Sequence, residues 1–89
     1  MRHIVFRSRL QRDLHRMKKR GTDIEKLLSA AKLLAHDGLL SARYRAHKLS
    51  GEYAGFWECH IEPDWLLIYA VTETEVFLAR TGTHADLFE

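Results

Sequence analysis

Residues 56–82 of this 89-residue chain read FWECHIEPDWLLIYAVTETEVFLARTG, and they contain three segments with the pattern of β-strands. Residues 56–62 alternate apolar and polar side chains, which predicts a strand with one buried face. Residues 65–71 are apolar on both faces, as in the central strand of a sheet. Residues 75–81 form a third strand after a turn at 72–74. The three strands together predict an antiparallel meander.

The first of these strands has two different faces. Its apolar face carries Trp57, Cys59 and Ile61. Its polar face carries Glu58, His60 and Glu62. Because side chains alternate across a strand, we expect the apolar face to meet the core and the polar face to remain open for chemistry.

Two amphipathic helices precede the strands. The first carries an apolar stripe of Leu10, Leu14 and Met17, with Ser8 as a candidate N-cap and Gly21 after its last turn. The second carries a stripe of Ile24, Leu27, Leu28, Ala31 and Leu34, capped by Thr22 or Asp23 and ended by Gly38. The short connection between them predicts an antiparallel helix hairpin.

These elements predict an α+β fold. An N-terminal strand at residues 3–6, at an edge or first in the sheet, and the helix hairpin pack on an antiparallel sheet. The helices cover one face of the sheet and leave the other available. Residues 85–88 are long enough only for a terminal helical turn.

The composition indicates one small domain. With 46% hydrophobic residues, the chain has enough apolar surface for a single modest core. Its longest apolar run, residues 65–71, is far shorter than the roughly 20 residues that cross a bilayer. Cys59 is the only cysteine, which rules out an internal disulfide. We therefore expect a single domain over residues 1–89, in the cytoplasm and without membrane contact.

The net charge of +2 conceals a strong asymmetry between the two halves of the chain. Residues 1–48 hold 13 Lys and Arg against 4 Asp and Glu, whereas residues 49–89 hold one Arg against 8 acidic residues. A basic half suits a polyanion such as nucleic acid, although a folded domain can also neutralise itself by bringing its halves together.

Four residues in or just before the strand half could move protons: His47, His60, Asp64 and His84. Acid-base catalysis needs convergence in space and a pKa near working pH, which histidine supplies. RNA is a fitting substrate, because its 2′-hydroxyl attacks the adjacent phosphate once a base removes its proton. The spacings do not match paired metal ligands on one helix or strand, and no serine occupies a nucleophile elbow, so we expect no metal and no cofactor.

Four segments, taken in order, resemble one known family. They are HKLSG at 47–51, ECHIEPDW at 58–65, LIY at 67–69 and RTGTHADLF at 80–88, and they closely resemble the YafQ family of the RelE/ParE superfamily of bacterial toxins. The resemblance implies a RelE-like, microbial RNase-like fold. It also implies a type II toxin that cuts mRNA in the ribosomal A site, with the 70S ribosome, mRNA and a DinJ-like antitoxin with an acidic helical C-terminal segment as partners.

By position, the family's functional residues fall on His47, His60, Asp64 and His84. We interpret His84 as the general acid, His47 or His60 as the general base and Asp64 as an orienting or polarising group. The substrate contacts implied are Arg80 as a phosphate ligand, with Phe88 and Lys48. The two aromatic residues of the apolar strand, Trp65 and Tyr69, are predicted to be core rather than stacking platforms.

One position departs from the family pattern. Many relatives carry Arg just before the acidic residue that corresponds to Glu58, whereas this chain has Trp57. Arg80, Lys48 or Arg45 then supplies the cationic contact, or Trp57 turns into the core. Two alternatives to a nuclease remain at the sequence level: a ParE-like toxin that binds DNA gyrase without nuclease chemistry, and a plain nucleic-acid-binding module.

Overall fold

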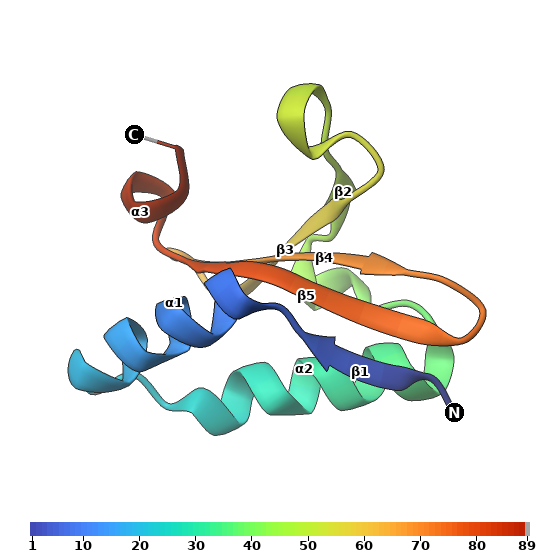
Figure 1. Ribbon diagram of the computed structural model, residues 1–89, viewed down its shortest axis with the longest axis horizontal. Coiled ribbons are helices and arrows are strands. Elements are labelled where there is room, and N and C mark those ends of the chain that lie inside the picture. The colour runs from blue at the N-terminus through green and yellow to red at the C-terminus, as the bar shows by residue number, and fades with distance from the viewer. Residues whose placement is uncertain (89) are drawn as a thin grey trace.

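The computed structural model describes residues 1–88, whose five strands form one sheet in the order β1-β5-β4-β3-β2 (Figure 1). The strands are β1 (His3–Phe6), β2 (His47–Lys48), β3 (Trp57–Glu62), β4 (Trp65–Val71) and β5 (Glu75–Gly82). The helices are α1 (Ser8–Lys19), α2 (Ile24–Asp37) and α3 (His84–Phe88), with 3-10 turns η1 (Ala42–Tyr44) and η2 (Gly51–Tyr53). None of the described helices is long and apolar enough to cross a bilayer.

The predicted meander is confirmed, since β3, β4 and β5 pair in antiparallel order. The N-terminal strand β1 is an edge strand, and it is the one exception to the antiparallel order. It runs parallel to β5, with Ile4 opposite Val76. A parallel pair needs a long crossover connection, and here α1, α2 and the other three strands lie between β1 and β5 in the sequence.

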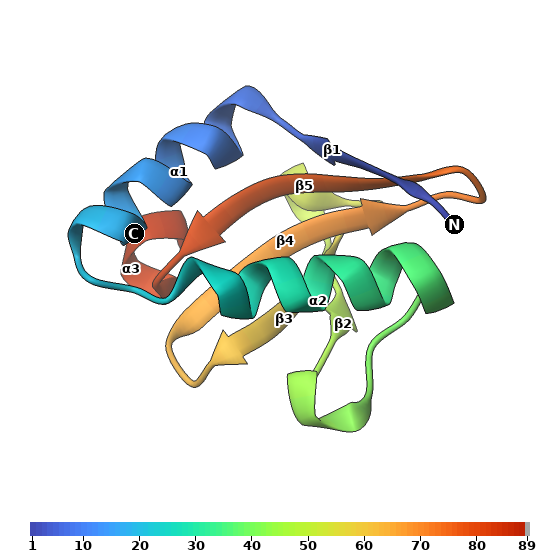
Figure 2. The ribbon, with the colours of Figure 1, turned by 90° about the horizontal axis from the view of Figure 1, so that it is seen from below.

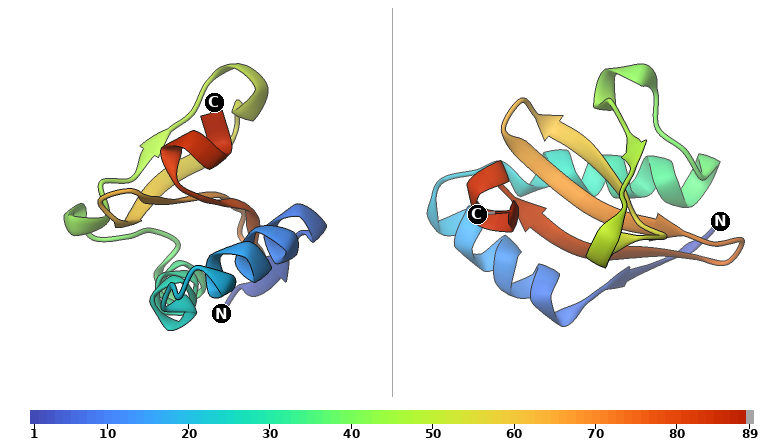
Figure 3. Two further views of the ribbon diagram at one scale, coloured as in Figure 1. Left: turned by 90° about the vertical axis from the view of Figure 1, so that its left-hand side faces the viewer. Right: turned by 90° about the horizontal axis from the view of Figure 1, so that it is seen from above.

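Both long helices lie on one face of the sheet, as predicted, while α3 and η2 rise on the other (Figure 3). The helix hairpin is splayed: α1 and α2 meet at their connecting turn and diverge across the sheet (Figure 2). The core fills the space between sheet and helices, with Leu10, Leu27, Leu34, Leu67 and Leu78 fully buried. Each fully buried leucine contributes about 1.5–3 kcal/mol of hydrophobic stabilisation.

The helix ends follow the sequence signals except at one position. Asp23 caps α2, because its carboxylate accepts a hydrogen bond from the Glu25 backbone N–H at 3.1 Å. Gly38 ends α2 with φ 78°, the left-handed conformation that glycine favours. The predicted cap of α1 is wrong: the helix begins at Ser8 itself, and Arg7 holds the cap position without a side-chain bond.

Trp65 and Tyr69 belong to the core, as predicted, with 2% and 3% of their surface exposed. Trp57 also packs against the core cluster, so the residue that departs from the family pattern turns inward. Cys59 is fully buried beside it, and this burial raises the pKa of its thiol to about 12. A thiol held neutral in this way is a structural residue and no nucleophile.

Two local features of the sheet differ from the sequence prediction. The short strand β2 was not predicted, because a two-residue His-Lys strand has no readable period. The expected position of Glu62 on the polar face is wrong. A register shift between His60 and Glu62 reverses the alternation, and the Glu62 carboxylate instead accepts a hydrogen bond from Lys26 Nζ of α2 at 2.6 Å.

Candidate active site

Strand register sets the layout of the sheet face opposite α1 and α2, called the open face below. Glu58 lies opposite Ile68, and Ile68 lies opposite Arg80. In the next row, His60 lies opposite Leu66. Leu66 and Ile68 are buried although they stand outside the core cluster, and they form an apolar floor beneath the polar groups.

At one end of this face, α3 presents His84 and Phe88, whose rings lie 5.1 Å apart between centroids. The backbone N–H of His84 donates a hydrogen bond to Asp64 Oδ1 at 3.1 Å. His60 belongs to the same cluster, because its Nδ1 lies 3.3 Å from the carbonyl oxygen of Pro63. The turn at Pro63 and Asp64 therefore touches both His60 and His84.

Helix α3 is anchored to the end of α1 by charged groups. Asp86 accepts hydrogen bonds from Arg20 Nη1 at 2.7 Å and Nη2 at 3.1 Å. Its carboxylate also accepts a hydrogen bond from the Thr83 backbone N–H at 2.9 Å, which caps the short helix. The Arg20 hydrogen bond is the main cause that lowers the pKa of Asp86 well below its usual range.

Gly82 allows this close approach between α3 and β5. Its φ of 157° is rare for residues with a side chain, and a Cβ there would lie 2.9 Å from the Cβ of Asp86. A larger residue at this position would push α3, and His84 with it, away from the open face.

Arg80 is held by Asp13, a carboxylate of α1 with 3% of its surface exposed. Arg80 Nε donates to Asp13 Oδ2 at 2.7 Å, and Arg80 Nη2 donates to Asp13 Oδ1 at 3.2 Å. Asp13 Oδ2 also accepts the Thr81 backbone N–H at 3.1 Å. The bond to Asp13 raises the pKa of Arg80. The contact with Asp13 uses Nε and Nη2, and Tyr53 is a further hydrogen-bonding neighbour of the guanidinium.

Across the face, β2 carries His47 opposite Glu58. His47 Nε2 lies 3.4 Å from Glu58 Oε1, and its Nδ1 lies 3.3 Å from the carbonyl oxygen of Arg45. The side chain of His47 is 54% exposed. Lys48 lies elsewhere: it pairs with Trp57, and its Nζ is 5.7 Å from the centre of that ring, on the face toward the helices.

Aromatic rings connect the two sides of the face. Tyr53 of η2 packs edge-on against Phe88 at 6.4 Å and against Phe56 at 6.3 Å between ring centroids. Phe88 keeps 41% of its surface exposed, which leaves it available for stacking on a base. Tyr53 and Arg80 also line a common pocket above Ala79.

The Pro63-Asp64 turn links the His60 ring to the backbone of His84, which is beside Phe88. Arg80 and His47 lie on the same face of the sheet, and Lys48 lies apart. The sequence did not single out Asp13, Tyr53 or Asp86. Asp13 does carry a readable signal, since it lies three residues after Leu10 and four before Met17, a carboxylate on the apolar stripe of a helix. In residues 1–88 no three His, Cys, Asp or Glu side chains are grouped as metal ligands.

This arrangement is that of toxins from type II toxin-antitoxin systems. The crystal structure of YafQ from Escherichia coli BL21(DE3) matches with a TM-score of 0.91 and 37% identity, covering 100% of both chains. The sequence model described as "Bacterial toxin of type II toxin-antitoxin system, YafQ" matches residues 2–89. The chain belongs to the YafQ family.

Two further relatives bear on activity and partners. The mRNA interferase toxin YafQ of E. coli K12 is 40% identical over 88 residues, covering 98% of this chain and 96% of the relative. The E. coli DinJ-YafQ complex contains a chain with a TM-score of 0.89 and 38% identity, covering 100% of both chains. The resemblance and the α+β fold expected from the sequence are confirmed, and the expected enzyme class, an mRNA interferase, is that of the E. coli relative.

Proposed function

We propose that this toxin is a ribosome-dependent endoribonuclease that cleaves mRNA in the A site by metal-independent acid-base catalysis, with the 2′-hydroxyl as nucleophile. The main support is the cluster at the end of the open face, where the Pro63-Asp64 turn contacts both His60 and His84. Residues 1–89 act as one toxin domain in this proposal. The ribosome supplies the substrate positioning that so small a protein lacks.

The geometry favours His60 over His47 as the general base. The Pro63 carbonyl accepts hydrogen bonds only, so His60 Nδ1 carries a proton and Nε2 keeps its lone pair. Both ring nitrogens of His47, in contrast, face acceptor oxygens, those of Arg45 and Glu58. His60 Nε2 therefore removes the 2′-hydroxyl proton, and the hydroxyl oxygen attacks the adjacent phosphorus.

His84 then acts as the general acid. It protonates the 5′ oxygen that leaves as the P–O bond breaks, and the product keeps a 2′,3′-cyclic phosphate. Asp64 acts as an orienting group, because its carboxylate binds the backbone N–H of His84 and fixes the start of α3. Arg80 offers its guanidinium to the phosphorane, whose charge is greatest in the transition state.

The proposed partners follow the same family evidence. A DinJ-like antitoxin binds this chain through an acidic, helix-forming C-terminal segment. The exposed cations of α1 are complementary to such a segment and to ribosomal RNA, and they include Arg9, Arg12, Lys18 and Lys19.

Cleavage with purified components tests the proposal. Purified toxin, 70S ribosomes and mRNA should give a cut within the A-site codon, and omission of ribosomes should abolish it. Cleavage should survive chelation of free divalent ions at a magnesium activity that keeps the ribosomes intact. Absence of cleavage with active ribosomes would contradict the proposal.

Gyrase inhibition is the alternative activity that shares this fold. It would require no histidine cluster, so the matched test is a DNA supercoiling assay with wild-type toxin and His84→Ala. We expect neither protein to inhibit supercoiling. Inhibition that is equal for both proteins would favour a toxin that acts by binding.

A further inference from the structure

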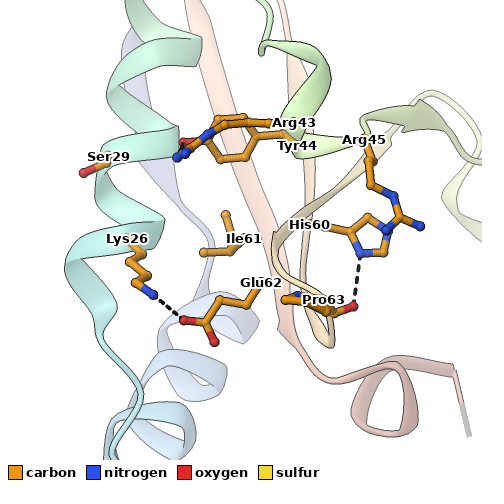
Figure 4. Close-up of a pocket in the computed structure, with 9 residues that line it drawn as sticks. All are labelled: Lys26, Ser29, Arg43, Tyr44, Arg45, His60, Ile61, Glu62 and Pro63. Atoms are coloured by element: carbon orange, nitrogen blue, oxygen red, sulfur yellow. Dashed lines mark hydrogen bonds and ion pairs between the residues drawn. The ribbon is translucent and has the colours of Figure 1, made fainter.

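A second cationic pocket lies at the edge of the sheet beside His60, between β3, α2 and η1 (Figure 4). It has a volume of about 420 Å³, and its lining includes Lys26, Arg43, Arg45, His60 and Glu62. The pocket is separate from Arg80, which lines a different pocket with Tyr53. The proposed mechanism uses only one member of its lining, His60.

Two of the three cations in the pocket are already engaged. Lys26 Nζ donates to Glu62 Oε2 at 2.6 Å. Arg43 Nη2 donates to the Tyr44 hydroxyl at 3.1 Å, and its guanidinium lies 4.8 Å from the centre of the Tyr44 ring. Within residues 1–88, the Arg45 guanidinium makes no hydrogen bond or ion pair, and its side chain points toward the His60 imidazole (Figure 4). Arg45 is therefore the cation available to a ligand.

The backbone of Arg45 fixes this orientation. Arg45 has φ 51° and ψ 43°. Among residues 1–88, it is the only residue other than glycine that has a positive φ. Such a conformation costs of order 1 kcal/mol or more for a residue with a side chain. It is held by the Arg45 N–H, which donates to the Ala42 carbonyl at 3.0 Å, while the Arg45 carbonyl lies 3.3 Å from His47 Nδ1. One residue thus contacts His47 through its backbone and aims its side chain at His60.

We propose that this pocket binds an mRNA backbone phosphate next to the linkage that is cut, with Arg45 as its main ligand. The proposal rests on the proposed nuclease function and extends it from one phosphate to two. A guanidinium binds phosphate through paired N–H donors, and here it does so beside the base His60. The phosphate at Arg45 and the scissile phosphate near Arg80 would hold the nucleotide between them across the open face.

The key variant is Arg45→Gly, because glycine adopts positive φ readily and so preserves the backbone that His47 contacts. Arg45→Lys retains the charge and loses the paired donors. The control is Lys32→Ala, which removes one exposed charge of α2 outside the pocket. Thermal melts and antitoxin binding of all variants report whether the fold is intact.

The assay measures cleavage on ribosomes programmed with a set of short mRNAs. Each mRNA carries one uncharged methylphosphonate at a single linkage near the cut, with a 2′-O-methyl group on the preceding ribose. The matched mRNA has the same 2′-O-methyl group and an ordinary phosphate. For wild-type toxin, we expect one non-scissile linkage at which neutralisation lowers kcat/KM about tenfold.

Arg45→Gly should show the same tenfold loss on the ordinary mRNA and no further loss when that linkage is neutral. Arg45→Lys should lie between the two, and Lys32→Ala should behave as wild type. The assignment of Arg45 is overturned if Arg45→Gly loses activity equally on every mRNA or loses none. In either case, cleavage by the wild-type toxin leaves the nuclease proposal standing. If wild-type toxin with active ribosomes cuts none of the mRNAs, the nuclease proposal fails and this inference falls with it.

Discussion

Two segments rise over the open face from opposite sides, and they are held in different ways (Figure 1). The α3 arm, residues 83–88, carries His84 and is anchored by Asp86 to Arg20, 66 residues earlier in the chain. The β2 arm, residues 45–56, carries His47 and is held at its base by a two-residue ladder with β3. Charged side-chain bonds fix the first arm, and exposed backbone pairing fixes the second.

The difference indicates different tasks. A general acid must meet one leaving oxygen, and a misplacement of about 1 Å can cost roughly a hundredfold in rate. The α3 arm has the bonds for that: Arg20 contributes two of them, and Thr83 and Asp64 contribute others. His47, with 54% of its side chain exposed, is placed to follow the shape of the substrate. The anchored arm should therefore be sensitive to single changes, and the β2 arm tolerant of them.

Removal of the acid gives the largest expected effect. His84→Ala should lower kcat for mRNA cleavage by about 10²–10⁴-fold, the usual contribution of a general acid. The His84 side chain is exposed and its ring lies beside the Phe88 ring, so the melting temperature of the variant should change little. Single-turnover cleavage on ribosomes measures the loss, and a rate within threefold of wild type would remove His84 from the mechanism.

Asp13→Asn tests whether Asp13 of α1 positions the Arg80 guanidinium for catalysis. The variant leaves Arg80 without its carboxylate partner, so we expect a loss of about 3 kcal/mol in the free energy of unfolding and a lower kcat. A positioning role predicts that Asp13→Asn lowers kcat in the wild type and has no further effect on kcat in Arg80→Ala. Additive losses in the double variant would show that Asp13 acts separately from Arg80.

Arg20→Ala releases the anchor of the α3 arm and leaves His84 itself in place. We expect kcat to fall about tenfold with little change in KM, because the acid is misplaced while substrate contacts elsewhere remain. Lys32→Ala, which removes an exposed charge of α2, is the control and should behave as wild type. Equal activities of the two variants would mean that the anchor does not set the position of His84.

The pH dependence of stability should report the same anchor. The pKa of Asp86 is lower in the folded than in the unfolded chain, so this group stabilises the fold above the ordinary Asp pKa of about 4. Its contribution is lost as pH falls below that value toward the lowered pKa. Thermal melts between pH 6 and 2 should therefore show a shallower acid decline for Asp86→Asn than for wild type. Parallel curves would contradict the lowered pKa.

Lys48→Ala should have the smallest effect. The lysine lies over the Trp57 ring on the helix side of the sheet, away from the histidines, so we expect cleavage within twofold of wild type. The lost cation-π contact is worth about 0.5–1 kcal/mol at an exposed site. A tenfold fall in kcat/KM would instead support the substrate contact that the family resemblance implies for Lys48.

Much of the fold could be predicted because its elements have readable periods. The alternation in β3, the apolar run of β4 and the stripes of α1 and α2 each encode burial directly. The parallel partner of β1 could not be predicted, since a four-residue strand fits either direction of pairing. The register shift before Glu62 was equally hidden, because it changes the direction of a side chain without changing the sequence pattern.

The candidate site likewise contains residues that could be predicted from the sequence and pairings that could not. His60, Asp64 and His84 could be selected as candidates because their residue types suit acid-base chemistry and match a family pattern. The ion pairs that hold the site were missed, since Asp13 and Arg80 lie 67 residues apart and Arg20 and Asp86 lie 66 apart. Arg20 and Asp86 each read locally as one more charge on a solvated surface, and the position of Asp13 on an apolar stripe does not identify its partner. Only the fold shows which of them are paired.

The central claim is that the open face cuts mRNA through its own 2′-hydroxyl, and one substrate change tests it most directly. Ribosomes programmed with an mRNA that carries a single 2′-deoxyribose at the cut linkage should yield no cleavage there, while the matched ribose mRNA is cut and leaves a 2′,3′-cyclic phosphate. Cleavage of the deoxy linkage at the rate of the ribose linkage would show that another nucleophile attacks the phosphate, and it would contradict the account.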